Sequence, residues 1–100
     1  MKGVIVRYKV KPDQAAENEE LVRAVYEELH RTNPAGLRYT TFKLDDGVSF
    51  AHLAWIETED GTNPLPTTEA FKRFQENIGD RCEELPVVTP VSEIGSYRGF

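Results

Sequence analysis

The order of hydrophobic patterns along the chain is the feature that most constrains its fold. Residues 3–10 alternate between apolar and polar side chains, which is typical of a half-buried strand. Residues 13–32 carry apolar side chains at helical spacing, and this helix is expected to end before Pro34. A strand followed by one long amphipathic helix leaves an apolar sheet face and an apolar helix stripe that must cover each other.

Four further segments complete the pattern. Residues 37–45 and 48–57 alternate around an Asp-Gly step and predict a hairpin. A second helix is expected to begin after Thr67 or Thr68 and to end near residue 84, and a last strand is expected within 90–98. The order βαββαβ predicts one α+β domain over residues 1–100, in which two helices cover one face of a four-stranded antiparallel sheet.

The second strand of the hairpin is apolar on both faces. Phe50, His52 and Ala54 share one face, while Leu53 and Trp55 share the other. Helices on one side can cover only one of these faces, so a homodimer is expected to cover the second. The register of the hairpin stays open. A two-residue loop pairs Thr41 with His52, whereas a three-residue loop pairs Thr40 with His52.

Composition excludes several classes of function. The net charge of −5 argues against binding to nucleic acid, which requires a basic patch. The single cysteine, Cys82, forms no internal disulfide and suits a reducing cytoplasm. No apolar run is long enough to predict a membrane span. No cluster of cysteine and histidine has metal-ligand spacing, so neither a metal nor a cofactor is expected.

His52 is the candidate catalytic residue. It lies in the middle of a strand on an otherwise apolar face, where an imidazole must find a hydrogen-bond partner. A threonine of the neighbouring strand is a natural partner, and a purely structural histidine is the alternative interpretation. The candidate substrate-binding residues are Trp55, Tyr39, Arg38 and Arg7, whose rings and guanidinium groups suit a planar acidic or phenolic ligand.

Several segments together resemble the dimeric α/β-barrel superfamily, and in particular small proteins similar to antibiotic biosynthesis monooxygenases. The segments are VIVRYKVKP (4–12), GLRY (36–39), SFAHLAW (49–55), FKRF (71–74) and GSYR (95–98). The resemblance implies a ferredoxin-like domain with sheet order 4-1-3-2 that pairs sheet to sheet with a second copy. It also implies a cavity between sheet and helices.

The resemblance implies two kinds of function, and both stay open here. One is a non-catalytic or structural dimer that binds a small molecule. The other is a monooxygenase that needs no cofactor and acts on a small aromatic or polyketide-like substrate. Haem-degrading relatives place an asparagine on the first strand and a histidine on the second helix. The first strand here has no asparagine, and Phe74 stands at the helix position, so haem chemistry is not expected.

The connection formed by residues 58–66 is long for this plan. It is expected to be the most mobile internal segment and to flank the mouth of the cavity. Leu65 is its only apolar residue other than proline, and we expect Leu65 to anchor the loop against a helix or the partner copy.

Overall fold

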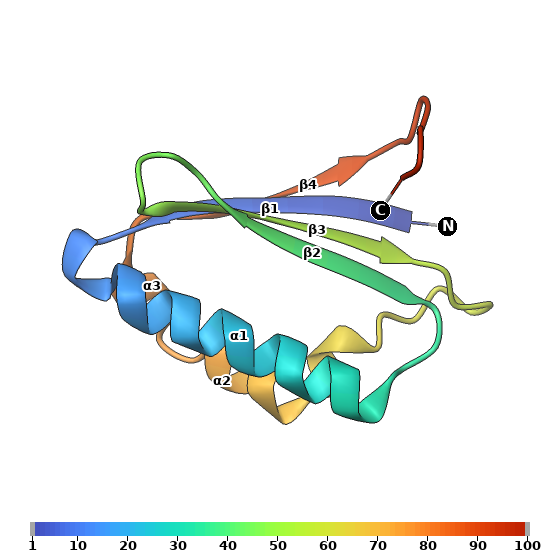
Figure 1. Cartoon of the computed structure of the whole chain (residues 1–100), viewed down its shortest axis with the longest axis horizontal. Coiled ribbons are helices and arrows are strands. Elements are labelled where there is room, and N and C mark those ends of the chain that lie inside the picture. Colours follow the sequence, from blue (N-terminus) through green and yellow to red (C-terminus); the bar gives the residue numbers. More distant parts are fainter. Residues whose placement is uncertain (1, 100) are drawn as a thin grey trace.

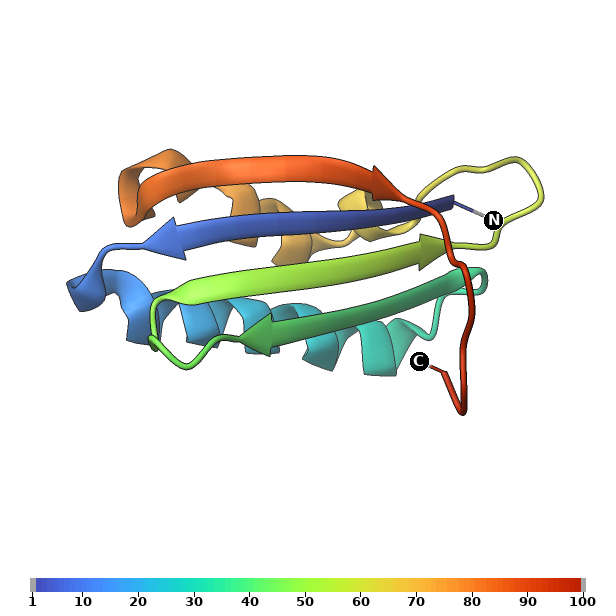
Figure 2. The ribbon, with the colours of Figure 1, turned by 90° about the horizontal axis from the view of Figure 1, so that it is seen from above.

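A four-stranded antiparallel sheet forms the centre of the computed structural model, which describes residues 2–99. β1 (Lys2–Val10) lies between β3 (Ser49–Ile56) and β4 (Cys82–Val91), and β2 (Leu37–Lys43) pairs with the other side of β3. The strand order β2-β3-β1-β4 confirms the predicted order 4-1-3-2. Figure 2 shows the four strands side by side.

All helices lie on one side of this sheet (Figure 1). A 3₁₀ turn (Pro12–Gln14) leads into the long helix α1 (Ala15–Thr32), and a second 3₁₀ turn (Leu65–Thr67) leads into the shorter α2 (Glu69–Gln75) and α3 (Ile78–Arg81). The predicted α+β plan, with helices covering one sheet face, is therefore confirmed.

Side chains and backbone close the ends of the two main helices. Asn33 ends α1 with a left-handed backbone, φ 47°, and its N–H donates to the carbonyl of Leu29. Thr68 caps α2, because its hydroxyl accepts from the N–H of Phe71. The Glu28 carboxylate of α1 also accepts from the first two N–H groups of α2, at 3.1 and 2.8 Å. These bonds fix α2 against α1.

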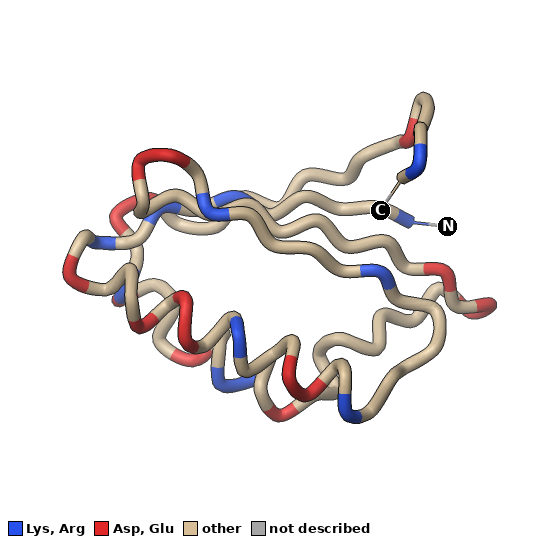
Figure 3. The backbone as a smooth tube through the Cα atoms, in the orientation of Figure 1, with Lys and Arg blue, Asp and Glu red and all other residues tan. Residues whose placement is uncertain are grey.

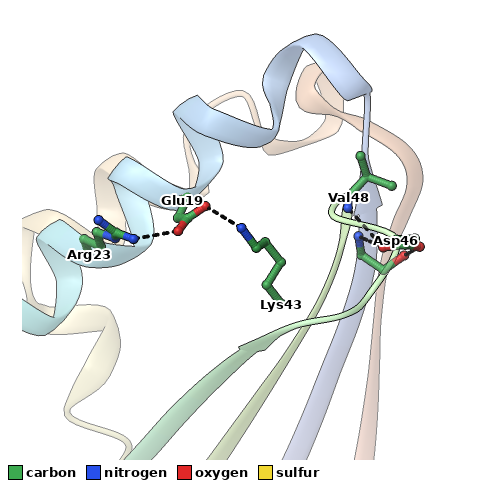
Figure 4. A network of polar contacts seen from close by, with 6 residues as sticks. Glu19, Arg23, Lys43, Asp46 and Val48 are labelled. Carbon is green, nitrogen blue, oxygen red and sulfur yellow. Dashed lines mark hydrogen bonds and ion pairs between the residues drawn. The ribbon is translucent and has the colours of Figure 1, made fainter.

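The hairpin has the register of the two-residue loop, because Thr41 pairs with His52. Asp46 stabilises the turn, since its carboxylate accepts from the N–H groups of Val48 and Ser49 and from the Ser49 hydroxyl (Figure 4). These bonds lower the pKa of Asp46. Gly47 has φ 75°, a conformation that glycine adopts without strain.

The predictions for the second helix and the last strand were wrong in their boundaries. The helix does not continue to residue 84, because Glu76 is extended and Asn77 has φ 58°. The last strand covers Cys82–Val91, and no strand is assigned from 92 to 99. Cys82, which was placed on the helix, therefore starts β4 and pairs with Val10.

β4 contains two prolines, Pro86 and Pro90. This is tolerated because β4 is an edge strand, where one side needs no N–H donor. The run of Val87, Val88 and Thr89 favours an extended strand, and it outweighs the helical spacing of the apolar residues before it.

The sheet has one face packed on the helices and one open face. Tyr8, Val10 and Phe50 belong to the core under α1 and α2. On the open face Trp55 packs over Gly3, its partner on β1, and is 8% exposed. Charged residues follow the helices and the strand ends, whereas much of the sheet is uncharged (Figure 3). The segment after β4 runs across the strand ends on the open side (Figures 1 and 2).

The loop between β3 and the second 3₁₀ turn is held by Leu65. This side chain is 2% exposed and belongs to the core, so the prediction that Leu65 anchors the loop is confirmed. A turn stabilises the loop tip, where the Thr58 hydroxyl donates to the carbonyl of Thr62 at 2.7 Å. The mobility of the loop stays a prediction.

Candidate functional site

A buried chain of polar side chains lies between the sheet and the helices, and His52 is at its centre. His52 is 4% exposed and comes from the middle of β3. Aromatic rings surround its imidazole at centroid distances of 5.3 to 5.7 Å, and they belong to Tyr8, Tyr39 and Phe74. The alternation of β3 turns His52 towards the helices, which is why a polar side chain is enclosed there.

One imidazole nitrogen faces Tyr8 of β1. The distance between Tyr8 Oη and His52 Nε2 is 2.8 Å, and Asn18 Nδ2 of α1 donates to the same phenol oxygen at 2.9 Å. Asn18 is 0% exposed, so its amide must be satisfied inside the protein. Its Oδ1 accepts from Arg81 Nε at 3.3 Å. The chain therefore reaches from β3 through β1 and α1 to α3.

Arg81 is the cationic end of this chain, and it is 5% exposed. Its guanidinium donates to the carbonyls of Phe74 and Glu76 at 2.6 and 2.9 Å, and it lies 5.5 Å from the centre of the Phe74 ring. Carbonyls at the C-terminal end of a helix favour a cation, and so does the face of an aromatic ring. Arg81 thus caps the C-terminal end of α2 and also donates to Asn18, the next member of the polar chain.

The other imidazole nitrogen faces β2. Tyr39 Oη lies 2.5 Å and Thr41 Oγ1 3.1 Å from His52 Nδ1. The contact with Thr41 confirms that a threonine of the neighbouring strand is a partner of His52. The chain continues to α1, because Tyr26 Oη lies 2.7 Å from Thr41 Oγ1. The Tyr26 ring stacks on the Tyr39 ring at 5.4 Å and 20°.

Burial decides the protonation of these groups. It lowers the pKa of His52 to about 4, so the imidazole is neutral at pH 7. Burial also raises the pKa values of Tyr8, Tyr39 and Tyr26, which therefore remain phenols. The centre consequently offers neutral donors and acceptors rather than charges.

Two clefts lie along the seam between α1 and β2, on the two sides of Tyr26. One has a volume of about 150 Å³ and is lined by Tyr26, Tyr39 and residues near the end of α1, including Leu29 and His30. The other has about 210 Å³ and is lined by Tyr26, Thr41 and residues of the first half of α1. The partners of His52 on β2 therefore reach the surface at this seam, although His52 itself is enclosed.

The structure divides the predicted site residues between the two sheet faces. His52 and Tyr39 lie together on the helix side. Trp55, Arg38 and Arg7 share the open face, where Arg38 pairs with Trp55 across the strands and forms an ion pair of 2.6 Å with Glu57. Arg7 lines an open-face groove of about 490 Å³. One small ligand therefore cannot contact all five residues within a single chain.

Sequence reasoning did not identify Asn18, Arg81 and Tyr26 as members of the site. Asn18 carried a usable signal, because it extends the apolar stripe of the first helix and a polar side chain there must find a buried partner. Arg81 carried none, since its role depends on the break after α2. Among residues 2–99, no group of histidine, cysteine and acidic residues is arranged to hold a metal ion.

The fold is that of solved structures described as antibiotic biosynthesis monooxygenases. One of these has 21% sequence identity and a TM-score of 0.76, with 95% of this chain and 100% of the other covered. The cofactor-independent oxygenase SnoaB from Streptomyces nogalater has 14% identity and a TM-score of 0.68, with 95% and 94% covered. The resemblance seen in the sequence is thus confirmed as a likeness of fold.

Other solved structures with this fold have no assigned activity. A protein of unknown function from Nitrosomonas europaea has 14% identity and a TM-score of 0.74, with 96% of this chain and 91% of the other covered. No protein-family model matches the sequence, and no curated protein matches it either. In the part of the chain that the structure describes, no helix is both long and apolar enough to cross a bilayer.

Proposed function

We propose that this protein binds a small planar aromatic molecule at the seam between α1 and β2, next to the His52 centre, without transforming it. The observation that carries the proposal is the aromatic and phenolic lining of this region. The stacked rings of Tyr26 and Tyr39 line one cleft, and their hydroxyls connect to His52. The two clefts are separate and have about 150 and 210 Å³, each below the roughly 300–1,000 Å³ of pockets for drug-sized ligands, so we expect a ligand of no more than one or two rings.

The lowered pKa of His52 and the hydrogen bonds of its two ring nitrogens favour binding over general-base catalysis. A base works best when its pKa lies near the operating pH, whereas burial lowers the pKa of His52 to about 4. Both ring nitrogens also have hydrogen-bond partners, at 2.8 Å from Tyr8 and 2.5 Å from Tyr39. A substrate would have to displace one of these phenols before it could transfer a proton to the imidazole.

A second candidate function is a cofactor-independent monooxygenase, which the likeness of fold to the oxygenase SnoaB supports. In this function dioxygen oxidises a phenol to a quinone and water, so that one oxygen atom enters the ring and the other leaves as water. Consumption of dioxygen in the presence of 1-naphthol, with a quinone as product, distinguishes this function from binding alone.

We also propose that two copies of the chain pack open face to open face. The open-face groove is lined by Ile5, Leu44, Val87 and Val91, and the exposed fractions of Leu44 and Val87 are 47% and 63%. Burial of such a surface stabilises an assembly by roughly 25 cal/mol for each Å² of apolar area. This dimer would leave the seam between α1 and β2 free, because the seam lies on the other side of the sheet.

The binding proposal is tested by NMR titration of the ¹⁵N-labelled protein with 2-naphthol. We expect shifts at the amides of Tyr26, Leu29, Tyr39 and Thr41, which line the clefts. The chain has one tryptophan, so the single indole N–H signal of Trp55 reports on the open face and should stay unchanged. Shifts confined to Trp55 and its neighbours, or no shifts at millimolar ligand, would contradict the proposed site.

A further inference from the structure

Arg81 fixes the orientation of the Asn18 amide. A guanidinium only donates, so the Asn18 oxygen accepts from Arg81 Nε at 3.3 Å, and the Asn18 nitrogen donates to Tyr8 Oη at 2.9 Å. The reversed amide would place two donors, Asn18 Nδ2 and Arg81 Nε, against each other. Both residues are buried, so bulk water does not reach such a contact to relieve it.

The Tyr8 hydroxyl then has one acceptor for its hydrogen. Its oxygen accepts from Asn18, and its only other hydrogen bond among residues 2–99 is with His52 Nε2, at 2.8 Å. Tyr8 is 4% exposed, and burial raises its pKa, so the hydroxyl keeps its hydrogen. If Nε2 donated, this hydrogen would be left without an acceptor inside the protein, which destabilises the fold. Tyr8 therefore donates to Nε2.

Tyr39 favours the opposite assignment, because its hydroxyl lies 2.5 Å from His52 Nδ1 on the β2 side. The two phenols differ in their surroundings. Tyr39 is half-buried and lines the smaller cleft, where water can accept from a hydroxyl, whereas the Tyr8 hydroxyl is enclosed between His52 and Asn18. Only Tyr39 can direct its hydrogen elsewhere, and its oxygen can then accept from Nδ1. The enclosed phenol, Tyr8, therefore decides which nitrogen of His52 carries the hydrogen.

We propose that Arg81 and Asn18 are positioning residues of the His52 centre, which hold the neutral imidazole in the tautomer with its hydrogen on Nδ1. Within residues 2–99 neither has a hydrogen bond with His52, and both act through Tyr8. His52 then presents an N–H to Tyr39 and Thr41 of β2, while its lone pair accepts from Tyr8.

This tautomer limits what His52 can do at the seam. A base that takes a proton from the seam needs a lone pair on Nδ1, and here Nδ1 carries a hydrogen. Arg81 and Asn18 therefore make His52 a hydrogen-bond donor towards β2. The assignment concerns the protein without a ligand, so it stands or falls independently of the proposed binding function.

The ¹⁵N spectrum of the imidazole at pH 7 tests the tautomer directly, because the nitrogen without hydrogen resonates far downfield of the N–H nitrogen. Couplings to the ring C–H hydrogens distinguish Nε2, which couples strongly to both, from Nδ1. The His30→Gln variant leaves one histidine, so the signals belong to His52. We expect Nε2 downfield and Nδ1 upfield. The reverse pattern, or the averaged shifts of two exchanging tautomers, would overturn the proposal.

Asn18→Asp, made in the same background, tests the action of Asn18. A carboxylate only accepts, and the Arg81 guanidinium beside it favours its ionised form. Tyr8 should then donate to the new carboxylate, and its oxygen should accept from His52 Nε2. The hydrogen of the imidazole should therefore move from Nδ1 to Nε2, so that the two ¹⁵N shifts exchange. If Nδ1 keeps the hydrogen in a folded Asn18→Asp protein, Asn18 is not a positioning residue.

Asn63→Asp is the matched control, because Asn63 accepts from the N–H of Leu65 at 3.0 Å and a carboxylate can accept in the same way. It lies outside the polar chain and should leave the ¹⁵N shifts of His52 unchanged. An equal exchange of shifts in this control would show a general response to an added charge and would overturn the proposal.

Arg81→Gln tests the action of Arg81 without changing Asn18. A side-chain amide can donate or accept, so the orientation of the Asn18 amide is no longer imposed. We expect both tautomers of His52 to be populated, with the two ¹⁵N shifts moved towards each other. Unchanged shifts in Arg81→Gln would show that Arg81 does not set the tautomer.

Discussion

His52 shows how a single residue in this protein combines a polar group with an apolar setting. Its strand position places it under the helices, and Tyr8, Tyr39 and Thr41 supply the partners that a buried imidazole needs. Burial lowers the pKa of His52, because the protonated ring would carry a charge in surroundings of low polarity.

The first prediction concerns pH and His52. Its pKa is about 4 in the folded protein and 6.5 in an unfolded chain, so the unfolded state binds the proton more readily. The contribution of His52 to stability is present above pH 6.5 and is lost as pH falls towards 4, by about 3 kcal/mol in total. Urea unfolding at several pH values measures it. The His52→Phe variant should show a clearly flatter dependence between pH 6.5 and 4.5, and an equally steep one would contradict the assignment.

The second prediction concerns the contact of Gly3 with Trp55. A Cβ at Gly3 would lie 2.5 Å from the Trp55 ring, so Gly3→Ala must displace a side chain that is 8% exposed. We expect a loss of about 1–3 kcal/mol in the free energy of unfolding. Gly95→Ala is the matched control, because nothing lies within 4 Å of the added carbon, and it should change stability by less than about 0.5 kcal/mol.

At the scale of elements, the break between α2 and α3 is what positions the cationic end of the site. The left-handed Asn77 turns the chain, so that Arg81 can reach back to the last carbonyls of α2. The next residue, Cys82, already pairs with β1. A continuous helix to residue 84 would have used these carbonyls in its own ladder and left no acceptors for Arg81.

We therefore expect Arg81→Met to lower the free energy of unfolding by about 2–4 kcal/mol, since it removes three hydrogen bonds from a buried cation. Arg73→Met is the control in the same region. Arg73 is exposed, and its replacement should cost less than about 0.5 kcal/mol. Equal effects of the two substitutions, measured by chemical denaturation, would show that Arg81 does not stabilise the end of α2.

The loop of residues 58–66 gives a second prediction for an element. Its tip is held by few bonds, such as the contact of Thr58 with Thr62, whereas β3 has a paired strand on each side. Amides 59–63 should therefore exchange with solvent far faster than those of 48–56. Hydrogen exchange measured by NMR decides this. Protection of the loop equal to that of β3 would identify it as a rigid brace.

At the scale of the whole molecule, the open sheet face exposes apolar side chains, and we expect a second copy of the chain to cover them. Leu44 and Val87 expose 47% and 63% of their surface beside the groove, and no helix within residues 2–99 covers this side. Sedimentation at micromolar concentration should give a particle of twice 11.4 kDa. Val87→Glu should shift it towards the monomer, whereas Gln75→Glu, on the exposed side of α2, should not. A monomer at every concentration would rule out the dimer.

Much of this architecture could be predicted from the sequence because it depends on local patterns. Alternation in β1 and β3 fixed which residues share a sheet face, and it placed His52 and Trp55 on opposite faces. The Asp-Gly step predicted the hairpin, and helical spacing predicted α1. Each of these signals repeats over several residues and needs no distant contact.

Tertiary structure decided the rest, since it depended on contacts between distant residues. Only packing shows that Tyr26, 15 positions from Thr41, and Arg81, 63 positions from Asn18, belong to one chain of hydrogen bonds. The start of β4 was decided by pairing with β1, which extended a segment whose apolar spacing favoured a helix. Local periodicity therefore determined the faces of the elements. The partners of the buried polar groups were determined by which elements the fold brings together, because a buried donor or acceptor must be satisfied by whatever lies beside it.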